Sequence, residues 1–151
     1  MNNILYFGRY EGWLRWLARG VRDGDAECIT KAAQLFDLML PDKCAVVPMP
    51  SHGGRATTML RVAEQVCDLK PTRALCDVLA CEPHEASYDI KKAGSFPKPF
   101  EMSVLDYGIC SYIPKDTYVI DNVVCTGATA GAALRALPFA HVCALAVSHW
   151  R

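Results

Sequence analysis

Apolar and polar positions alternate along the chain in blocks that predict helices and strands in turn. Residues 25–40, DAECITKAAQLFDLML, carry apolar side chains at helical spacing, with Asp25 at the N-cap and Pro41 after the last turn. The same spacing recurs in 56–69, ATTMLRVAEQVCDL, while 128–137, ATAGAALRAL, reads as a helix of small residues that can pack close to a sheet. A shorter helix that ends near Gly20 is expected in EGWLRWLARG.

Short continuous apolar runs predict strands that are covered on both faces. They are CAVVPMP (44–50), CDVLAC (76–81), DTYVIDNVV (116–124) and HVCALAVSHW (141–150), with NILYF (3–7) as a short strand or edge segment. Because strands alternate with helices, we expect an α/β fold with three layers and a central, mainly parallel sheet. A chain of 151 residues favours one domain over residues 1–151.

Residues 82–103 interrupt the alternation. The segment EPHEASYDIKKAGSFPKPFEMS holds three prolines, a glycine and scattered charges, which argue against a packed element. A loop of this length inside a small domain is usually functional or mobile. We therefore expect a mobile flap over 82–103, and a solvated charged loop is the alternative.

Composition narrows the class of protein. A formal net charge of +0 argues against general binding of nucleic acid through its phosphates. A hydrophobic content of 52% indicates a globular chain. No apolar run is long enough to cross a bilayer, and the first residues do not resemble a signal peptide. The eight cysteines lack the short paired spacing of a zinc site, so we expect buried, reduced thiols in a cytoplasmic protein.

Two loops leave the carboxyl ends of predicted strands, where open parallel sheets bind their ligands. In VIDNVVCTGAT, Asp121 and Asn122 end a strand, and Thr126, Gly127 and Thr129 lead into a helix. Free N–H groups at a helix start and small hydroxyl side chains suit a phosphate, while a carboxylate suits sugar hydroxyls or a metal-bound water. Together they describe a site for ribose 5-phosphate. The plainer alternative is that Thr126 caps the helix and Asp121 merely ends a strand.

At residues 118–129, YVIDNVVCTGAT resembles the phosphoribosyl pyrophosphate signature of type I phosphoribosyltransferases, in which apolar residues precede two acids, an apolar pair and a T-G-x-T-like phosphate loop. The resemblance implies that Asp121 and Asn122 face the ribose hydroxyls, with Asp121 as a ligand of Mg²⁺. It also implies a 5-phosphate held by Cys125, Thr126, Gly127, Ala128 and Thr129. The chain departs from the pattern at Asn122, where the family usually has a second acid.

The same resemblance assigns the turn in VVPMPSHGGR to pyrophosphate, held by Ser51, His52, Gly53, Gly54 and Arg55. Glycines let the backbone approach an anion, and Arg55 can form a fork to phosphate oxygens. A glycine-rich surface turn is the alternative. In the flap, Lys91 and Lys92 are candidates to meet the leaving pyrophosphate. Trp150 is a candidate to stack on the base, or else to pack at a surface or an oligomer interface.

The resemblance implies a cytoplasmic glycosyltransferase of nucleotide metabolism that passes ribose 5-phosphate to a nitrogenous base and releases pyrophosphate. Asp121, Asn122 and Arg55 would carry this chemistry. Asn122 keeps open a catalytically weak or inactive regulatory protein that binds phosphoribosyl pyrophosphate or a nucleotide. A third option is an unrelated doubly wound protein with a similar loop, although no Gly-Lys-Ser/Thr of a Walker site occurs. The tryptophans at 13 and 16 leave a homodimer contact open.

Overall fold

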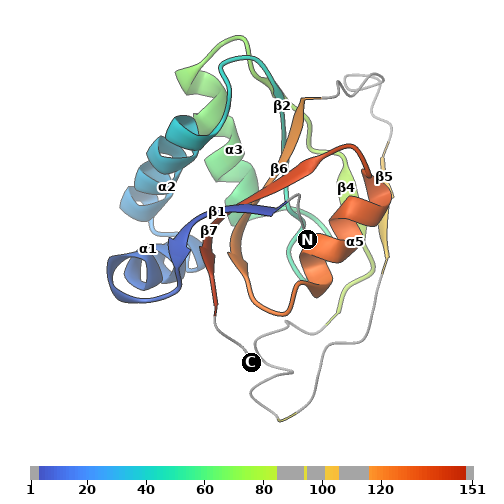
Figure 1. The fold of residues 1–151 in the computed structure, drawn as a ribbon, viewed down its shortest axis with the longest axis horizontal. Coiled ribbons are helices and arrows are strands. Elements are labelled where there is room, and N and C mark those ends of the chain that lie inside the picture. The colour runs from blue at the N-terminus through green and yellow to red at the C-terminus, as the bar shows by residue number, and fades with distance from the viewer. Residues whose placement is uncertain (1–3, 85–93, 95–100, 106–115, 149–151) are drawn as a thin grey trace.

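A computed structural model describes residues 4–84, 94, 101–105 and 116–148 of the chain (Figure 1). Its central sheet has five strands in the order β1-β7-β6-β2-β3, and every neighbouring pair is parallel. The strands are β1 (Ile4–Arg9), β2 (Ala45–Pro48), β3 (Ala74–Leu75), β6 (Thr117–Val124) and β7 (His141–Val147). This confirms the predicted α/β class and the parallel sheet.

Helices cover both faces of the sheet (Figure 1). On one face lie α1 (Gly12–Arg22), α2 (Ala26–Met39) and α3 (Thr58–Leu69), which share a buried apolar cluster with Ile120 and Leu145 of the sheet. On the other face α5 (Ala128–Ala136) packs its small side chains against a second cluster. Among the described helices, none combines the length and the apolar character that a bilayer span needs.

The helix boundaries follow the local signals closely. The Asp25 carboxylate accepts a hydrogen bond of 2.9 Å from the backbone N–H of Cys28, as the predicted N-cap of α2 requires. Helix α1 continues past Gly20 to Arg22. A side chain at Gly20 would place its Cβ 2.2 Å from Cys28 Sγ, so this glycine serves the close contact of α1 with α2 and does not end the helix.

A two-stranded antiparallel ribbon stands apart from the main sheet, and the sequence analysis did not predict it. Its strands are β4 (Leu79–Cys81) and β5 (Met102–Val104). The strand expected over 76–81 is therefore wrong in its bounds, since only Ala74–Leu75 joins the main sheet. The predicted flap, 82–103, ends inside this ribbon, where Met102 is buried in the cluster beside α5 and lies in a paired strand. Lys91 and Lys92 lie outside the described residues.

Arg73 joins the helices at the end of the sheet where the parallel strands begin. Its side chain is fully buried and forms an ion pair of 2.7 Å with Asp37. It also donates to the backbone carbonyls of Pro41 (3.0 Å), Val66 (3.1 Å) and Leu40 (3.1 Å). These carbonyl groups lie near the C-terminal ends of α2 and α3, where backbone carbonyls have no hydrogen-bond partner within the helix. One guanidinium thus joins two helices to the start of β3.

The opposite end of the sheet, at the carboxyl ends of the strands, contains a topological switch point. From β2 the chain passes through α3 to β3, on one side, and from β6 it passes through α5 to β7, on the other. The connections that leave β2 and β6 therefore diverge although the strands are neighbours. In open α/β sheets, ligands bind in the crevice at such a point.

Candidate functional site

Three residues, 125–127, carry the chain from β6 into α5. Gly127 is the N-cap of the helix and has a φ of 84°, a left-handed conformation that favours glycine. The Thr126 hydroxyl accepts a hydrogen bond of 3.2 Å from the N–H of Ala128. The first turn of α5 adds further N–H groups, which have no partner within a helix. The loop therefore turns sharply into the N-terminus of α5, which is the positive end of the helix dipole.

Beside this loop lies a small cavity of about 40 Å³. Because a water molecule needs at least about 10–15 Å³, the cavity has room for roughly three waters or a small anion. Residues of β6, of the loop and of the first turn of α5 line it, namely Asp121, Val123, Val124, Cys125, Thr126, Gly127, Thr129 and Ala130. All the residues assigned to the 5-phosphate except Ala128 are thus part of this lining.

Asp121 is the one carboxylate in the lining of this cavity. It is half-buried, and desolvation raises its pKa to about 6, although a hydrogen bond from the N–H of Asn122 (2.7 Å) acts in the opposite direction. A carboxyl group with this pKa changes its charge near neutral pH. It can bind hydroxyl groups in either protonation state but attracts a cation only when ionised.

Asn122 lies on the opposite face of the sheet from Asp121, because successive side chains of a strand point to opposite faces. Its side-chain amide donates a hydrogen bond of 2.7 Å to the backbone carbonyl of Ala18 in α1. Its Oδ1 atom is buried and has no hydrogen-bond partner in the described part of the chain. In this structure the amide holds α1 against β6 and is turned away from the cavity.

The turn after β2 closes on itself. The N–H and the hydroxyl of Ser51 both donate to the Arg55 carbonyl, at 3.0 and 2.9 Å. Gly54 N–H donates to the Ser51 carbonyl (3.0 Å) and Gly53 N–H to the Ser51 hydroxyl (3.3 Å). These three N–H groups are therefore already used within the turn. As the turn is folded here, a phosphate would meet mainly its side chains.

Gly54 is the position in this turn that requires glycine. Its φ is 108°, and a Cβ built on it would lie 2.6 Å from the backbone oxygen of Cys81. The close approach serves two bridges between the turn and the residues that lead into the flap. Cys81 N–H donates to the Gly54 carbonyl (3.0 Å), and His84 N–H donates to the His52 carbonyl (2.8 Å).

Arg55 forms an ion pair of 3.1 Å with Asp77, which follows β3. The guanidinium also donates to the backbone carbonyl of Asp77 (3.3 Å), and the second carboxylate oxygen, Oδ1, is buried without a hydrogen-bond partner among the described residues. Asp77 fixes the direction of the Arg55 side chain. Asp77 was not among the predicted site residues, because it fell inside the strand predicted over 76–81, whereas β3 ends at Leu75.

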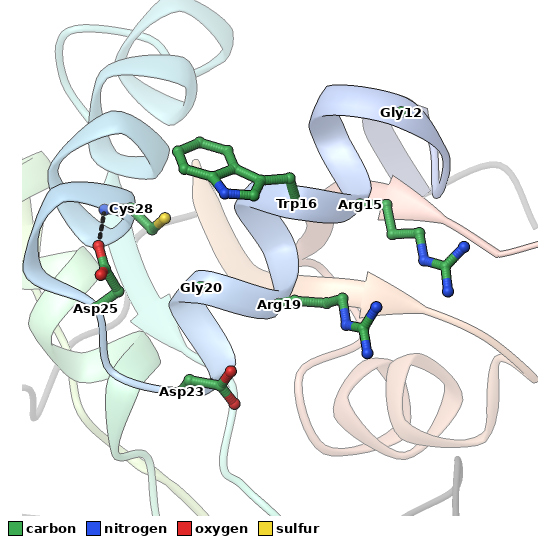
Figure 2. A pocket seen from close by; sticks show the side chains of 8 residues that line it. All are labelled: Gly12, Arg15, Trp16, Arg19, Gly20, Asp23, Asp25 and Cys28. Atoms are coloured by element: carbon green, nitrogen blue, oxygen red, sulfur yellow. Dashed lines mark hydrogen bonds between the residues drawn. The ribbon is translucent and has the colours of Figure 1, made fainter.

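A second, wider hollow of about 490 Å³ opens on the surface between α1 and the start of α2 (Figure 2). Figure 2 shows Trp16 on one side of α1, with Arg15 and Arg19 projecting together on the other. The wall of this hollow contains two arginines and two aspartates, so the positive and negative charges are equal in number. It is lined by Gly12, Arg15, Trp16, Arg19, Gly20, Asp23, Asp25 and Cys28.

The remaining predicted residues are distributed as follows. Seven cysteines fall within the described residues, and no disulfide joins any two of them. Cys110 and Trp150 lie outside the described part of the chain, as do the flap lysines. No family model matches this chain, and no curated protein matches it either.

Proposed function

We propose that this protein is phosphoribosyltransferase-like, of type I, and binds phosphoribosyl pyrophosphate. Its reaction would transfer ribose 5-phosphate to a nitrogenous base and release pyrophosphate. One observation carries the proposal: the two loops that resemble the family leave neighbouring parallel strands, β2 and β6, at the switch point of the sheet. A shared loop motif alone would not require that arrangement.

The cavity beside α5 suits the 5-phosphate. Backbone N–H groups of the first helical turn and the hydroxyls of Thr126 and Thr129 would donate to its oxygens, and the helix dipole favours the negative charge. Asp121 lies in the lining of the same cavity and would accept hydrogen bonds from the ribose hydroxyls. Arg55 lies on the neighbouring loop, where it would face the pyrophosphate.

Mg²⁺ belongs to the proposal as a partner of the substrate. Proteins usually bind Mg²⁺ through one or two carboxylates together with substrate phosphates, so Asp121 alone can serve as the protein ligand. This fits the described residues, in which no three His, Cys, Asp or Glu side chains gather into a metal cluster. When bound, Mg²⁺ would neutralise charge on the leaving pyrophosphate.

In this reaction the protein would mainly position the reactants and stabilise charge. The bond between C1 of the ribose and the pyrophosphate oxygen breaks, the leaving group takes the electron pair, and a base nitrogen forms the new bond to C1. Arg55 would stabilise the charge that grows on the leaving oxygen, while Asp121 would orient the ribose. Lys91, Lys92 and Trp150 remain proposed contacts for pyrophosphate and base.

Isothermal titration with phosphoribosyl pyrophosphate and Mg²⁺ tests the binding step. We expect binding by the natural chain and at least about tenfold weaker binding by Thr129→Val, which removes a hydroxyl donor but retains the shape of the side chain. Val123→Thr, which alters a residue of the same cavity without removing a donor, is the matched control. Absence of binding up to millimolar ligand would overturn the proposal and leave the unrelated doubly wound protein as the better reading.

The second candidate is a regulatory protein that binds phosphoribosyl pyrophosphate or a nucleotide without turnover. The contact between Asn122 and Ala18 favours it, because the position of the second family acid here serves helix packing. Pyrophosphate release measured with a set of purine and pyrimidine bases distinguishes the two. Turnover with any base rejects the regulatory protein, and binding without turnover supports it.

The proposal places the protein in the cytoplasm. Seven cysteines without a disulfide among the described residues suit a reducing compartment. Alkylation of the protein as it occurs in cells, followed by mass spectrometry, would show whether these thiols are reduced there.

A further inference from the structure

The strand β1 forms one edge of the main sheet and exposes three large apolar side chains in a row. Leu5, Tyr6 and Phe7 are 42%, 54% and 44% exposed. Since successive side chains point to opposite faces, apolar side chains are half-exposed on both faces of the sheet at this edge. This differs from the usual pattern, in which an edge strand hides its apolar face and shows a polar one.

This edge also lacks the features that normally prevent strand pairing. Natural sheets protect their edges with prolines, lysines, bulges or very short strands. Residues Ile4–Phe7 contain no charge and no proline, and β1 is six residues long. The opposite edge is protected by its length, because β3 has only two residues. The two edges of one sheet therefore differ in their readiness to pair.

The backbone groups of β1 that point away from the sheet can be identified. Tyr10 N–H donates to the Val147 carbonyl of β7 (2.9 Å), so by alternation the even-numbered residues of the strand face β7. The N–H and C=O groups of Leu5 and Phe7 then point outward, where a further strand could bind them.

Two further exposed aromatic residues lie on α1, which follows β1 directly in sequence. Trp13 and Trp16 are 50% and 48% exposed, and their ring centroids are 6.3 Å apart. Since a buried aromatic side chain hides about 150–250 Å², four half-exposed aromatic residues leave roughly 300–500 Å² on each copy. Two copies together approach the ~1,000 Å² that a specific interface needs.

We propose that β1 pairs with β1 of a second copy, antiparallel and about a two-fold axis, so that two five-stranded sheets join into one. With Tyr6 on the axis, Leu5 lies opposite Phe7 of the partner subunit, and each such pair exchanges two backbone hydrogen bonds. A second copy fits because Ile4–Phe7, the uncharged part of β1, is complementary to itself, and because the chain has a net charge of +0. The proposal does not depend on the function proposed above.

Sedimentation velocity of the full chain over a dilution series tests the proposal. The natural chain should sediment as a dimer of twice 16.6 kDa when concentrated. Leu5→Lys places like charges near the axis and should weaken the dimer at least about tenfold. Leu38→Lys is the matched control, because Leu38 is 76% exposed on α2 and lies outside this surface.

A natural chain that stays monomeric at every concentration would overturn the proposal, as would a dimer that Leu5→Lys leaves unchanged. Equal weakening by Leu38→Lys would place the interface elsewhere and would overturn it too. If Leu5→Lys does not fold, hydrogen exchange on the natural chain decides. The amides of Leu5 and Phe7 should be protected in concentrated protein and should exchange on dilution, and amides that exchange equally at both concentrations would refute the pairing.

Discussion

The side-chain amide of Asn122 binds the backbone carbonyl of Ala18 at 2.7 Å, so the residue joins β6 to α1. Asp121, its neighbour in sequence, lies on the other face of the sheet and lines the cavity beside α5. Two residues that resemble one functional pair therefore contribute to different regions of the molecule. The distinction leads to opposite expectations for substitutions at the two positions.

Asn122→Asp should destabilise the protein by about 1–3 kcal/mol, because a carboxylate cannot donate to the Ala18 carbonyl and would be buried beside it. Asn122→Ala should cost less, since it removes the unpaired Oδ1 atom together with the donor. Urea unfolding of both variants measures the difference. If the two variants lose equal stability, or if Asn122→Asp gains pyrophosphate release without losing stability, the packing role assigned to Asn122 is incorrect.

Asp121 should make the stability of the protein depend on pH. Its pKa is raised from 3.8 to about 6, so between these values the folded state keeps a proton that the unfolded state has lost. Stability from this group is therefore greatest below pH 3.8, falls as the pH rises to about 6, and stays low above it.

Asp121→Asn should abolish this contribution. Above pH 6 we expect the variant to be more stable than the natural chain by about 1–2 kcal/mol, after allowance for partial exposure of the side chain. The difference between the two unfolding free energies, measured across the pH range, isolates this group from the other carboxylates. A difference that does not change with pH would show that Asp121 has an ordinary pKa.

Much of the fold could be predicted from local patterns. Asp25 and Pro41 indicate the bounds of α2, and the apolar runs at 44–50 and 116–124 locate β2 and β6. The ribbon of β4 and β5 could not be predicted, because three-residue strands that are far apart in sequence leave no periodic signal. The two candidate loops could be located because each follows a predicted strand, whereas the direction of the Asn122 side chain depends on α1, which is distant in sequence.

Gly54→Ala should be clearly more destabilising than Gly53→Ala. A methyl group at Gly54 would meet the Cys81 carbonyl at 2.6 Å on a backbone with a φ of 108°, which should cost about 2–3 kcal/mol. At Gly53 the nearest atom would be the Ser51 hydroxyl at 3.5 Å, which is ordinary contact, so we expect about 0.5 kcal/mol or less. Thermal unfolding of the two variants compares them directly, and equal melting temperatures would contradict the geometry described for this turn.

Arg73→Lys should destabilise the protein by about 2–4 kcal/mol. Lysine retains the charge opposite Asp37, but its single nitrogen cannot replace a planar guanidinium that donates to several carbonyls at once. Arg22→Lys is the control, since Arg22 pairs with Asp23 on the surface and its replacement should change the unfolding free energy by less than about 0.5 kcal/mol. A small loss at Arg73 would mean that the ion pair alone, and not the set of carbonyl contacts, stabilises this edge.

The location of Arg73 bears on how this chain can evolve. Arg73, with its several polar contacts, lies where the strands begin, and the loops that follow β2 and β6 lie where the strands end. Inherited changes in those loops therefore leave the contacts of Arg73 with α2 and α3 in place. Under the proposed function, a lineage could therefore exchange one ligand for another while its descendants kept the same fold.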